Sequence, residues 1–167
     1  MMRRIGFWLM LNALLMGCSS TPEPEPPPPP TIVKLAIESA GLINPDDGGK
    51  AAPVMLRVYE LRDTSSFASA DFFALFDSEQ ATLSADLVRK QELLIKPGDT
   101  KLLTLEPDDD VRALGFFAAF RRLDTAQWRG IAPVKPHQTQ GYKVKLENYQ
   151  LNVQPVEMAE QAPEAKP

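Results

Sequence analysis

The sequence has little of the residue types from which most active sites are built. Among its 167 residues, Cys18 is the one cysteine and His137 the one histidine. A single cysteine excludes an intramolecular disulfide, and a single histidine excludes a histidine-rich metal site. No Gly-x-Ser-x-Gly or Walker motif is present, and His137 stands in a Pro-His-Gln segment where a solvated loop side chain is expected. We therefore predict no enzyme and no metal site. A hydrolase whose catalytic pair is assembled by the fold stays open as an alternative.

Positive charge is also in short supply. The chain has 18 Lys and Arg against 22 Asp and Glu, a formal net charge of −4, without a basic cluster. Such a chain is not expected to bind nucleic acid or to be drawn by charge to anionic lipid. Nor does it have an apolar run long enough to span a bilayer, since Ile5–Met16 is too short. Membrane attachment, if present, needs another source.

The N-terminus supplies such a source. Arg3 and Arg4 precede the apolar run, which has the length of a signal-peptide core. Leu15-Met16-Gly17-Cys18 resembles a bacterial lipobox, whose cysteine takes up a diacylglycerol before cleavage. The alternative is an ordinary secretory signal with a chance cysteine, but lipidation gives the lone thiol a use.

We predict that residues 1–17 are removed and that Cys18 carries a diacylglycerol and an N-linked acyl chain. Two or more acyl chains suffice for stable membrane attachment. Ser19 follows the cysteine, and a residue other than Asp there favours the outer membrane. The mature protein is therefore expected at the periplasmic face of the outer membrane, with no cofactor other than its lipid.

Proline divides the rest of the chain. Residues 18–30 join the lipidated cysteine to the sequence SSTPEPEPPPPP, which cannot form a sheet or helix and is expected to be an extended spacer of roughly 35–40 Å. Residues 155–167 are rich in proline, alanine and glutamate and are predicted to be a disordered tail. Residues 31–154 between them are long enough for one domain.

Alternation of apolar and polar residues predicts an all-β domain. The expected strands are Thr31–Ala40, Pro53–Arg62, Leu87–Ile95, Lys101–Leu105, Val111–Arg122, Gln127–Val134 and Gly141–Val153. Val111–Arg122 also fits a buried helix, but its neighbours favour a strand. The pattern changes phase at Glu147-Asn148, which predicts a turn or bulge. Ser65–Phe76 has helical spacing and predicts one helix capped by Ser65 or Ser66. The whole indicates a β-sandwich with a small covering helix.

Acidic and aromatic clusters have structural explanations. Asp46-Asp47-Gly48-Gly49 and Asp108-Asp109-Asp110 lack the spaced ligands of a calcium loop and are expected to be solvated turns. Trp128 fits either the core or a contact with a partner. The phenylalanines expected in the core are Phe72, Phe73, Phe116, Phe117 and Phe120.

The connection after the first predicted strand is apolar at its start. Leu42 and Ile43 precede the turn signal Asn44-Pro45 and a flexible segment that ends near Lys50. Because loops usually run over the surface, these two side chains either fold back or meet another molecule. From the residues alone, folding back is favoured.

An ordered series of short matches resembles the outer-membrane lipoprotein of bacterial type VI secretion systems, the TssJ family. The matches are a lipobox, a proline-rich spacer, Asn44-Pro45, Pro53–Leu61, Phe67 with Asp71-Phe72, Pro97-Gly98, Phe116–Arg121 and Trp128-Arg129. The resemblance covers about residues 33–153. It implies a transthyretin-like sandwich of two sheets with an added helix.

The resemblance also implies a function. Proteins of this family are not enzymes; they anchor the secretion machine to the outer membrane. They bind the periplasmic C-terminal domain of TssM, an inner-membrane protein that associates with TssL. The loop between the first two strands contributes to that contact, and here it corresponds to residues 41–52. The candidate partner-binding residues are Leu42, Ile43, Asn44, Pro45, Asp46, Asp47 and Lys50. The alternative is another binding lipoprotein on the same fold, for a solute or for peptidoglycan.

Overall fold

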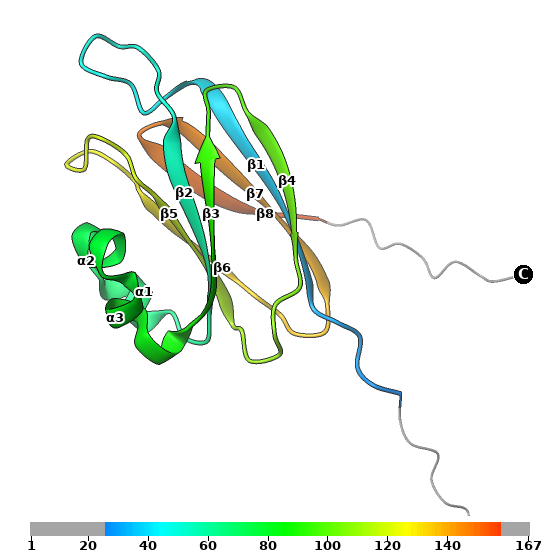
Figure 1. Ribbon diagram of the computed structural model, residues 1–167. Coiled ribbons are helices and arrows are strands. Elements are labelled where there is room, and N and C mark those ends of the chain that lie inside the picture. Colours follow the sequence, from blue (N-terminus) through cyan, green and yellow to red (C-terminus); the bar gives the residue numbers. More distant parts are fainter. Residues whose placement is uncertain (1–25, 158–167) are drawn as a thin grey trace, which may run out of the picture.

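Two four-stranded sheets pack face to face in the computed structural model, which describes residues 26–157 (Figure 1). The predicted signal peptide, Cys18, most of the spacer and residues 158–167 lie outside the described residues. The predicted β-sandwich is confirmed. The strands are β1 (Ile32–Ile43), β2 (Val54–Leu61), β3 (Leu87–Ile95), β4 (Thr100–Leu105), β5 (Ala113–Ala118), β6 (Arg129–Pro133), β7 (Thr139–Asn148) and β8 (Gln150–Val156).

The first sheet has the order β4-β1-β7-β8 and the second the order β3-β2-β5-β6. Neighbouring strands are antiparallel, except that β1 and β7 run parallel. The turn at Lys96–Asp99 carries the chain from β3 in the second sheet to β4 in the first, with Gly98 at a φ of 78°. Glycine takes this left-handed conformation without steric cost.

The core between the sheets is built from alternate residues of each strand. Val54, Leu56 and Val58 of β2 point into it, whereas Tyr59 and Leu61 on the opposite face lie in a second apolar cluster under the helices. The strand predicted over Pro53–Arg62 thus has two apolar faces. Strand β5 is buried along its whole length, which explains why its sequence lacks a clear alternation and fits a helix as well.

The helical region differs from the prediction of one helix. It consists of α1 (Ser65–Ser69), α2 (Phe72–Asp77), α3 (Glu79–Leu83) and the 3₁₀ turn η1 (Ser84–Asp86), which lie on the outer face of the second sheet (Figure 1). Asp71 is extended and its carboxylate accepts the Ala74 N–H at 2.8 Å, so a new helix begins there. The predicted cap at Ser65 or Ser66 is wrong, because Thr64 is the N-cap and makes no side-chain bond.

Four further expectations need correction. Phe73 is not a core residue: α2 begins at Phe72 and leaves Phe73 with 62% of its surface exposed. The first strand continues past Ala40 to Ile43, so the connection is shorter than predicted. Strand β8 continues to Val156, beyond the predicted domain end at 154. Pro155, expected in the tail, lies opposite Tyr142 in that strand, where proline is tolerated because β8 is an edge strand.

The phase change at the end of β7 corresponds to a tight turn, as predicted. Glu147 pairs with Gln150 across it, and Asn148 has a φ of 51°. No helix within residues 26–157 is long and apolar enough to cross a membrane.

Candidate partner-binding site

The two ends of the sandwich carry different segments of the chain. The spacer enters β1 at one end, and the chain leaves β1 at the other, where four connections lie (Figure 1). One of them is the β3–β4 turn (residues 96–99), which bonds Ser39 and Ala40 of β1. We call the other three the loop end: the β1–β2 loop (residues 44–53), the β5–β6 segment (119–128) and the β7–β8 turn (148–149).

Asn44 holds the three connections of the loop end together. Its Nδ2 donates to the Pro53 carbonyl at 3.0 Å, its Oδ1 accepts the Arg121 N–H at 2.8 Å, and its backbone N–H donates to the Asn148 carbonyl at 2.7 Å. The residue is 3% exposed with a φ of 43°, a left-handed conformation that asparagine tolerates better than most residues. Asn44 therefore lies at the base of the loop, and both polar atoms of its side chain form hydrogen bonds within the protein.

The tip of the β1–β2 loop is ordered by Asp46. Its Oδ1 accepts the backbone N–H groups of Gly48 at 3.0 Å and Lys50 at 2.9 Å. Gly49 closes the turn with a φ of 78°. The predicted turn is confirmed, and the Asp46 carboxylate stabilises it by accepting backbone hydrogen bonds within the loop. Among residues 26–157, no group of three or more His, Cys, Asp or Glu is placed to hold a metal ion.

A second chain segment braces the loop from outside. The Arg122 guanidinium pairs with Asp47 at 2.9 Å and lies 5.9 Å from the centre of the Tyr149 ring. The bond to Asp47 raises the pKa of Arg122 above its usual value. Tyr149 in turn donates its hydroxyl to the Pro45 carbonyl at 2.5 Å. Sequence reasoning missed Arg121, Arg122 and Tyr149, because they come from segments far from the loop along the chain.

The candidate residues therefore fall into two groups. Ile43 is fully buried and Asn44 nearly so, so folding back is confirmed for Ile43 and these two side chains do not form an outer surface. For Leu42 the expected folding back is wrong, because its side chain lies at the end of β1 with 46% of its surface exposed. Asp47 and Lys50 are exposed at the loop tip. The surface of the loop end is thus mixed, with one apolar side chain beside charges of both signs.

Two other flagged residues lie elsewhere. His137 is in the turn before β7, with Nδ1 3.0 Å from the Pro29 carbonyl and 3.8 Å from Asp109. It thus contacts the end of the spacer, whereas the sequence predicts a solvated side chain. Trp128 packs between Phe72 and Phe117, with ring centres 5.4 and 5.6 Å away, so it joins the cluster under the helices.

The surface of the described residues also has a shallow hollow of about 350 Å³ on the outer face of the first sheet. Its rim includes Leu102, Val156 and Tyr142, and Lys34 is the one charged residue that lines it. This lining is apolar and does not bring together the acidic or nucleophilic groups that a hydrolase site requires.

This arrangement defines a class of protein: a β-sandwich that follows a proline-rich segment at one end and carries ordered, mixed-polarity loops at the other. Residues 31–149 match the model of the type VI secretion lipoprotein family T6SS-SciN, described as VasD, EvfM and TssJ. The chain belongs to this family.

Solved structures agree with the family match. The chain is similar to the type VI secretion lipoprotein TssJ1 from Pseudomonas aeruginosa, with 37% identity, a TM-score of 0.76 and coverage of 78% of this chain and 100% of that chain. It is also similar to Serratia marcescens Lip, a membrane-bound component of the type VI secretion system, with 24% identity, a TM-score of 0.65 and coverage of 77% and 99%. A chain of a structure described as a type VI membrane complex has 25% identity, a TM-score of 0.66 and coverage of 75% and 98%. No curated protein matched.

Proposed function

We propose that the protein anchors the type VI membrane complex to the outer membrane. In this proposal the acyl chains on Cys18 hold one end at the periplasmic face of that membrane. The loop end binds the periplasmic C-terminal domain of a TssM-like inner-membrane protein, with TssL in the wider complex. Membership of the lipoprotein family and the likeness to a chain of a type VI membrane complex support this role.

The opposite placement of spacer and loops is the observation that carries the proposal. Strand β1 has 12 residues, which at about 3.3 Å per residue separates its ends by roughly 35 Å. The spacer precedes Ile32 at one end, and the β1–β2 loop follows Ile43 at the other. A domain hung from the membrane by its spacer therefore directs the loop end toward the periplasm.

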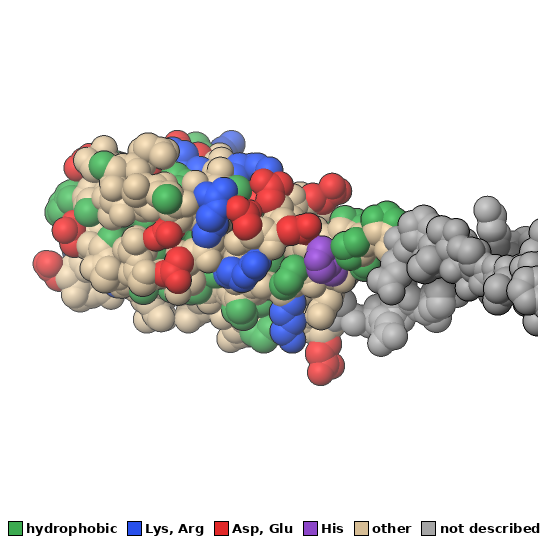
Figure 2. Space-filling model, turned by 90° about the horizontal axis from the view of Figure 1, so that it is seen from below, with side chains coloured by type: hydrophobic (Ala, Val, Ile, Leu, Met, Phe, Trp, Pro, Cys, Tyr) green, Lys and Arg blue, Asp and Glu red, His purple; other side chains and the backbone are tan. Residues whose placement is uncertain are grey.

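The spacer end itself supports attachment through lipid. Seen from that end, acidic and basic side chains are interspersed without a large patch of one sign (Figure 2). Such a surface gives little electrostatic attraction to anionic lipid. Acyl chains on Cys18 supply the membrane affinity without it.

The loop end is ordered before any partner arrives. Asn44, the Arg122–Asp47 pair and the Tyr149 hydroxyl join three connections into one surface. A surface that is already ordered loses less conformational entropy on binding than a free loop. The loop end thus suits a specific protein contact.

One experiment tests both halves of the proposal in the native bacterium. Cys18→Ser is expected to release the protein from the outer membrane and abolish type VI secretion, while Ser19→Ala leaves both unchanged. Asp47→Arg breaks the pair with Arg122 and places a third positive charge beside it and Lys50. It is expected to lower co-purification of the TssM-like protein several-fold.

Glu106→Arg makes the same change of charge at the other end of the sandwich and serves as the matched control. Anchoring is refuted if the Cys18→Ser protein still fractionates with outer membranes. Recovery of murein fragments without a TssM-like protein would replace the proposal by the peptidoglycan-binding alternative.

A further inference from the structure

The second sheet carries an exposed apolar surface beside α2. Phe73 and Phe76 of α2 are 62% and 39% exposed, and Leu94 of β3 is 59% exposed. Met55 and Ala119 are half-buried next to the cluster under the helices. We call these five residues the aromatic patch. Contiguous apolar side chains at the surface of a soluble domain mark an interaction site more often than scattered ones do.

Strand pairing joins three residues of the patch. Leu94 lies directly opposite Met55 in the β2–β3 pair, and the Ala119 N–H donates to the Met55 carbonyl at 2.9 Å. These three residues share the outer face of the sheet just beyond the area that α2 covers. Phe76 borders them, because its ring lies 5.5 Å from the guanidinium of Arg57, two residues along β2.

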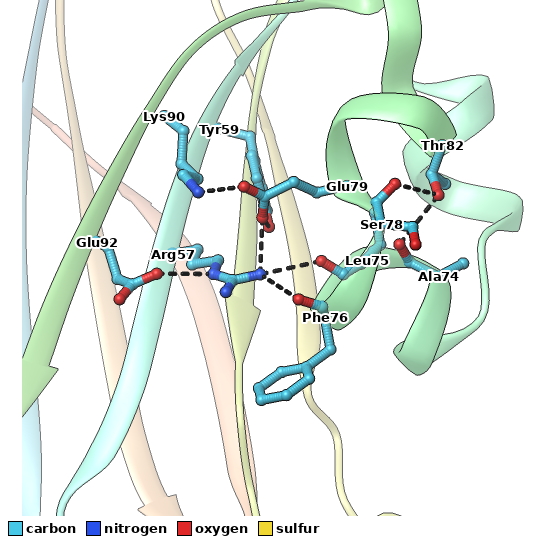
Figure 3. A network of polar contacts seen from close by, with 10 residues as sticks. All are labelled: Arg57, Tyr59, Ala74, Leu75, Phe76, Ser78, Glu79, Thr82, Lys90 and Glu92. Carbon is cyan, nitrogen blue, oxygen red and sulfur yellow. Dashed lines mark hydrogen bonds and ion pairs between the residues drawn. The ribbon is translucent and has the colours of Figure 1, made fainter.

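A polar network fixes α2 in place (Figure 3). Arg57 donates to the Leu75 and Phe76 carbonyls, both at 3.0 Å, and so caps the end of the helix. The same guanidinium pairs with Glu79 at 2.7 Å and Glu92 at 2.9 Å. Lys90 and the Tyr59 hydroxyl also bond Glu79.

Ring packing holds the patch from beneath. Phe72 lies 4.9 Å from Phe117, 5.7 Å from Phe76 and 5.4 Å from Phe73, measured between ring centres. Phe73 thus projects outward from Phe72, which is packed against Phe117 of the sheet. Rigid aromatic side chains lose little entropy on binding and dominate the energy of many interfaces.

The patch continues into the loop end. Ala119 is the first residue of the β5–β6 segment; Arg122 in the same segment pairs with Asp47, and Trp128 at its far end packs on Phe72. One surface therefore runs from the tip of the β1–β2 loop to Phe73.

The usual size of a stable protein interface implies that a partner covers more than the β1–β2 loop. A standard protein interface engages roughly 20–30 residues on each side. The β1–β2 loop, residues 44–53, is much shorter than that, and Asn44 and Ala52 within it are buried. A partner bound at the loop must extend onto neighbouring surface. The aromatic patch is the adjoining region with the greatest exposed apolar content.

We propose that the aromatic patch is the second half of the docking surface for the TssM-like periplasmic domain, with Phe73 inserted into an apolar region of that domain. The inference rests on the proposed function, since the partner is the same. It adds a site and a chemistry: charged contacts at the loop tip and apolar contacts at α2.

The test measures binding of the full-length lipoprotein in detergent to the periplasmic domain of the TssM protein from the same bacterium. Phe73→Ala is expected to raise the dissociation constant about tenfold, as truncation of an interface anchor does. Leu94→Ala, beside the anchor, is expected to raise it several-fold. Leu102→Ala is the matched control: it removes an 83% exposed leucine from the outer face of the first sheet. Thermal unfolding of each variant reports that the fold is intact.

The outcomes separate the two proposals. Binding that falls with Phe73→Ala and Leu94→Ala but not with Leu102→Ala supports the patch. Binding that falls with Asp47→Arg, while both patch variants bind like the wild type, overturns the patch and leaves the proposed function standing. No binding by the wild-type protein overturns both.

Discussion

The outer faces of the two sheets differ more than their similar strand patterns suggest. The first sheet presents Lys34, Lys143 and Lys145 with acidic neighbours to solvent, and Lys143 pairs with Glu38 at 3.0 Å. The second sheet has Tyr59, Leu61 and Phe117 on its outer side, all fully buried under the helices. A sandwich needs apolar residues on its inner faces alone. The second outer face is therefore built for an additional layer, which the helices supply in part.

Removing a large apolar side chain should reduce the free energy of unfolding far more on the outer face of the second sheet than on that of the first. Phe117 is fully buried and packs against Phe72 and Trp128. Phe117→Ala is expected to lower the free energy of unfolding by about 3–5 kcal/mol, through lost burial and a cavity. Leu102→Ala on the other outer face should change it by less than about 0.5 kcal/mol. Urea unfolding of the two variants measures both; similar losses would refute the difference between the faces.

Breaking an ion pair should also reduce the free energy of unfolding more on the second sheet than on the first, but by a smaller difference. The Arg57 and Glu79 side chains are 12% and 17% exposed, whereas Lys143 and Glu38 are 44% and 40% exposed. Arg57→Ala leaves Glu79 largely buried and uncaps α2, and is expected to cost about 2–3 kcal/mol. Lys143→Ala should cost no more than about 0.5 kcal/mol.

A double variant checks the cause. Without Arg57, the largely buried Glu79 carboxylate keeps Lys90 and the Tyr59 hydroxyl as partners. Adding Glu79→Gln to Arg57→Ala removes the charge that Arg57 no longer offsets and should recover part of the lost unfolding free energy. If the double variant is as unstable as the sum of the two single variants, the charge is not the reason for the loss.

The smallest effect concerns a charge on the inner side of β2. Glu60 is 2% exposed and pairs with Arg89 at 3.2 Å. Burial raises the pKa of the Glu60 carboxyl above its usual 4.5, and the nearby Arg89 offsets part of this rise. The folded chain then holds the proton more tightly than the unfolded chain. This group therefore favours folding below pH 4.5 and loses that contribution as pH rises through the raised pKa.

Glu60→Gln removes this pH dependence. The decline in unfolding free energy between pH 4.5 and neutral pH should be smaller in the variant than in the wild type. Urea midpoints across that range measure it, and parallel profiles for the two proteins would contradict the expectation.

Sequence reasoning succeeded where a local pattern carries the information. Alternation located the strands, and the phase change at Glu147-Asn148 located the β7–β8 turn. It failed in the helical region, where Asp71 restarts a helix and turns Phe73 outward. Spacing alone cannot distinguish one helix from three short ones in which similar residues recur.

The candidate site was predicted in part for the same reason. Asn44 and Asp47 stand in a recognisable turn sequence, so the β1–β2 loop was identified. Its supports were not: Asp47 is 75 residues from Arg122 along the chain, and Pro45 is 104 residues from Tyr149. Only the pairing of strands brings such residues together.

The sequence by itself therefore determined the strands, the one cysteine available for lipid and the shortage of catalytic residue types, because these depend on local periodicity and composition. The tertiary structure decided which loop side chains stay exposed, how Arg57 fixes α2, and that Phe73 and Leu94 face solvent. Those features depend on contacts between segments distant in the chain, and they are set when the two sheets and the helices pack together.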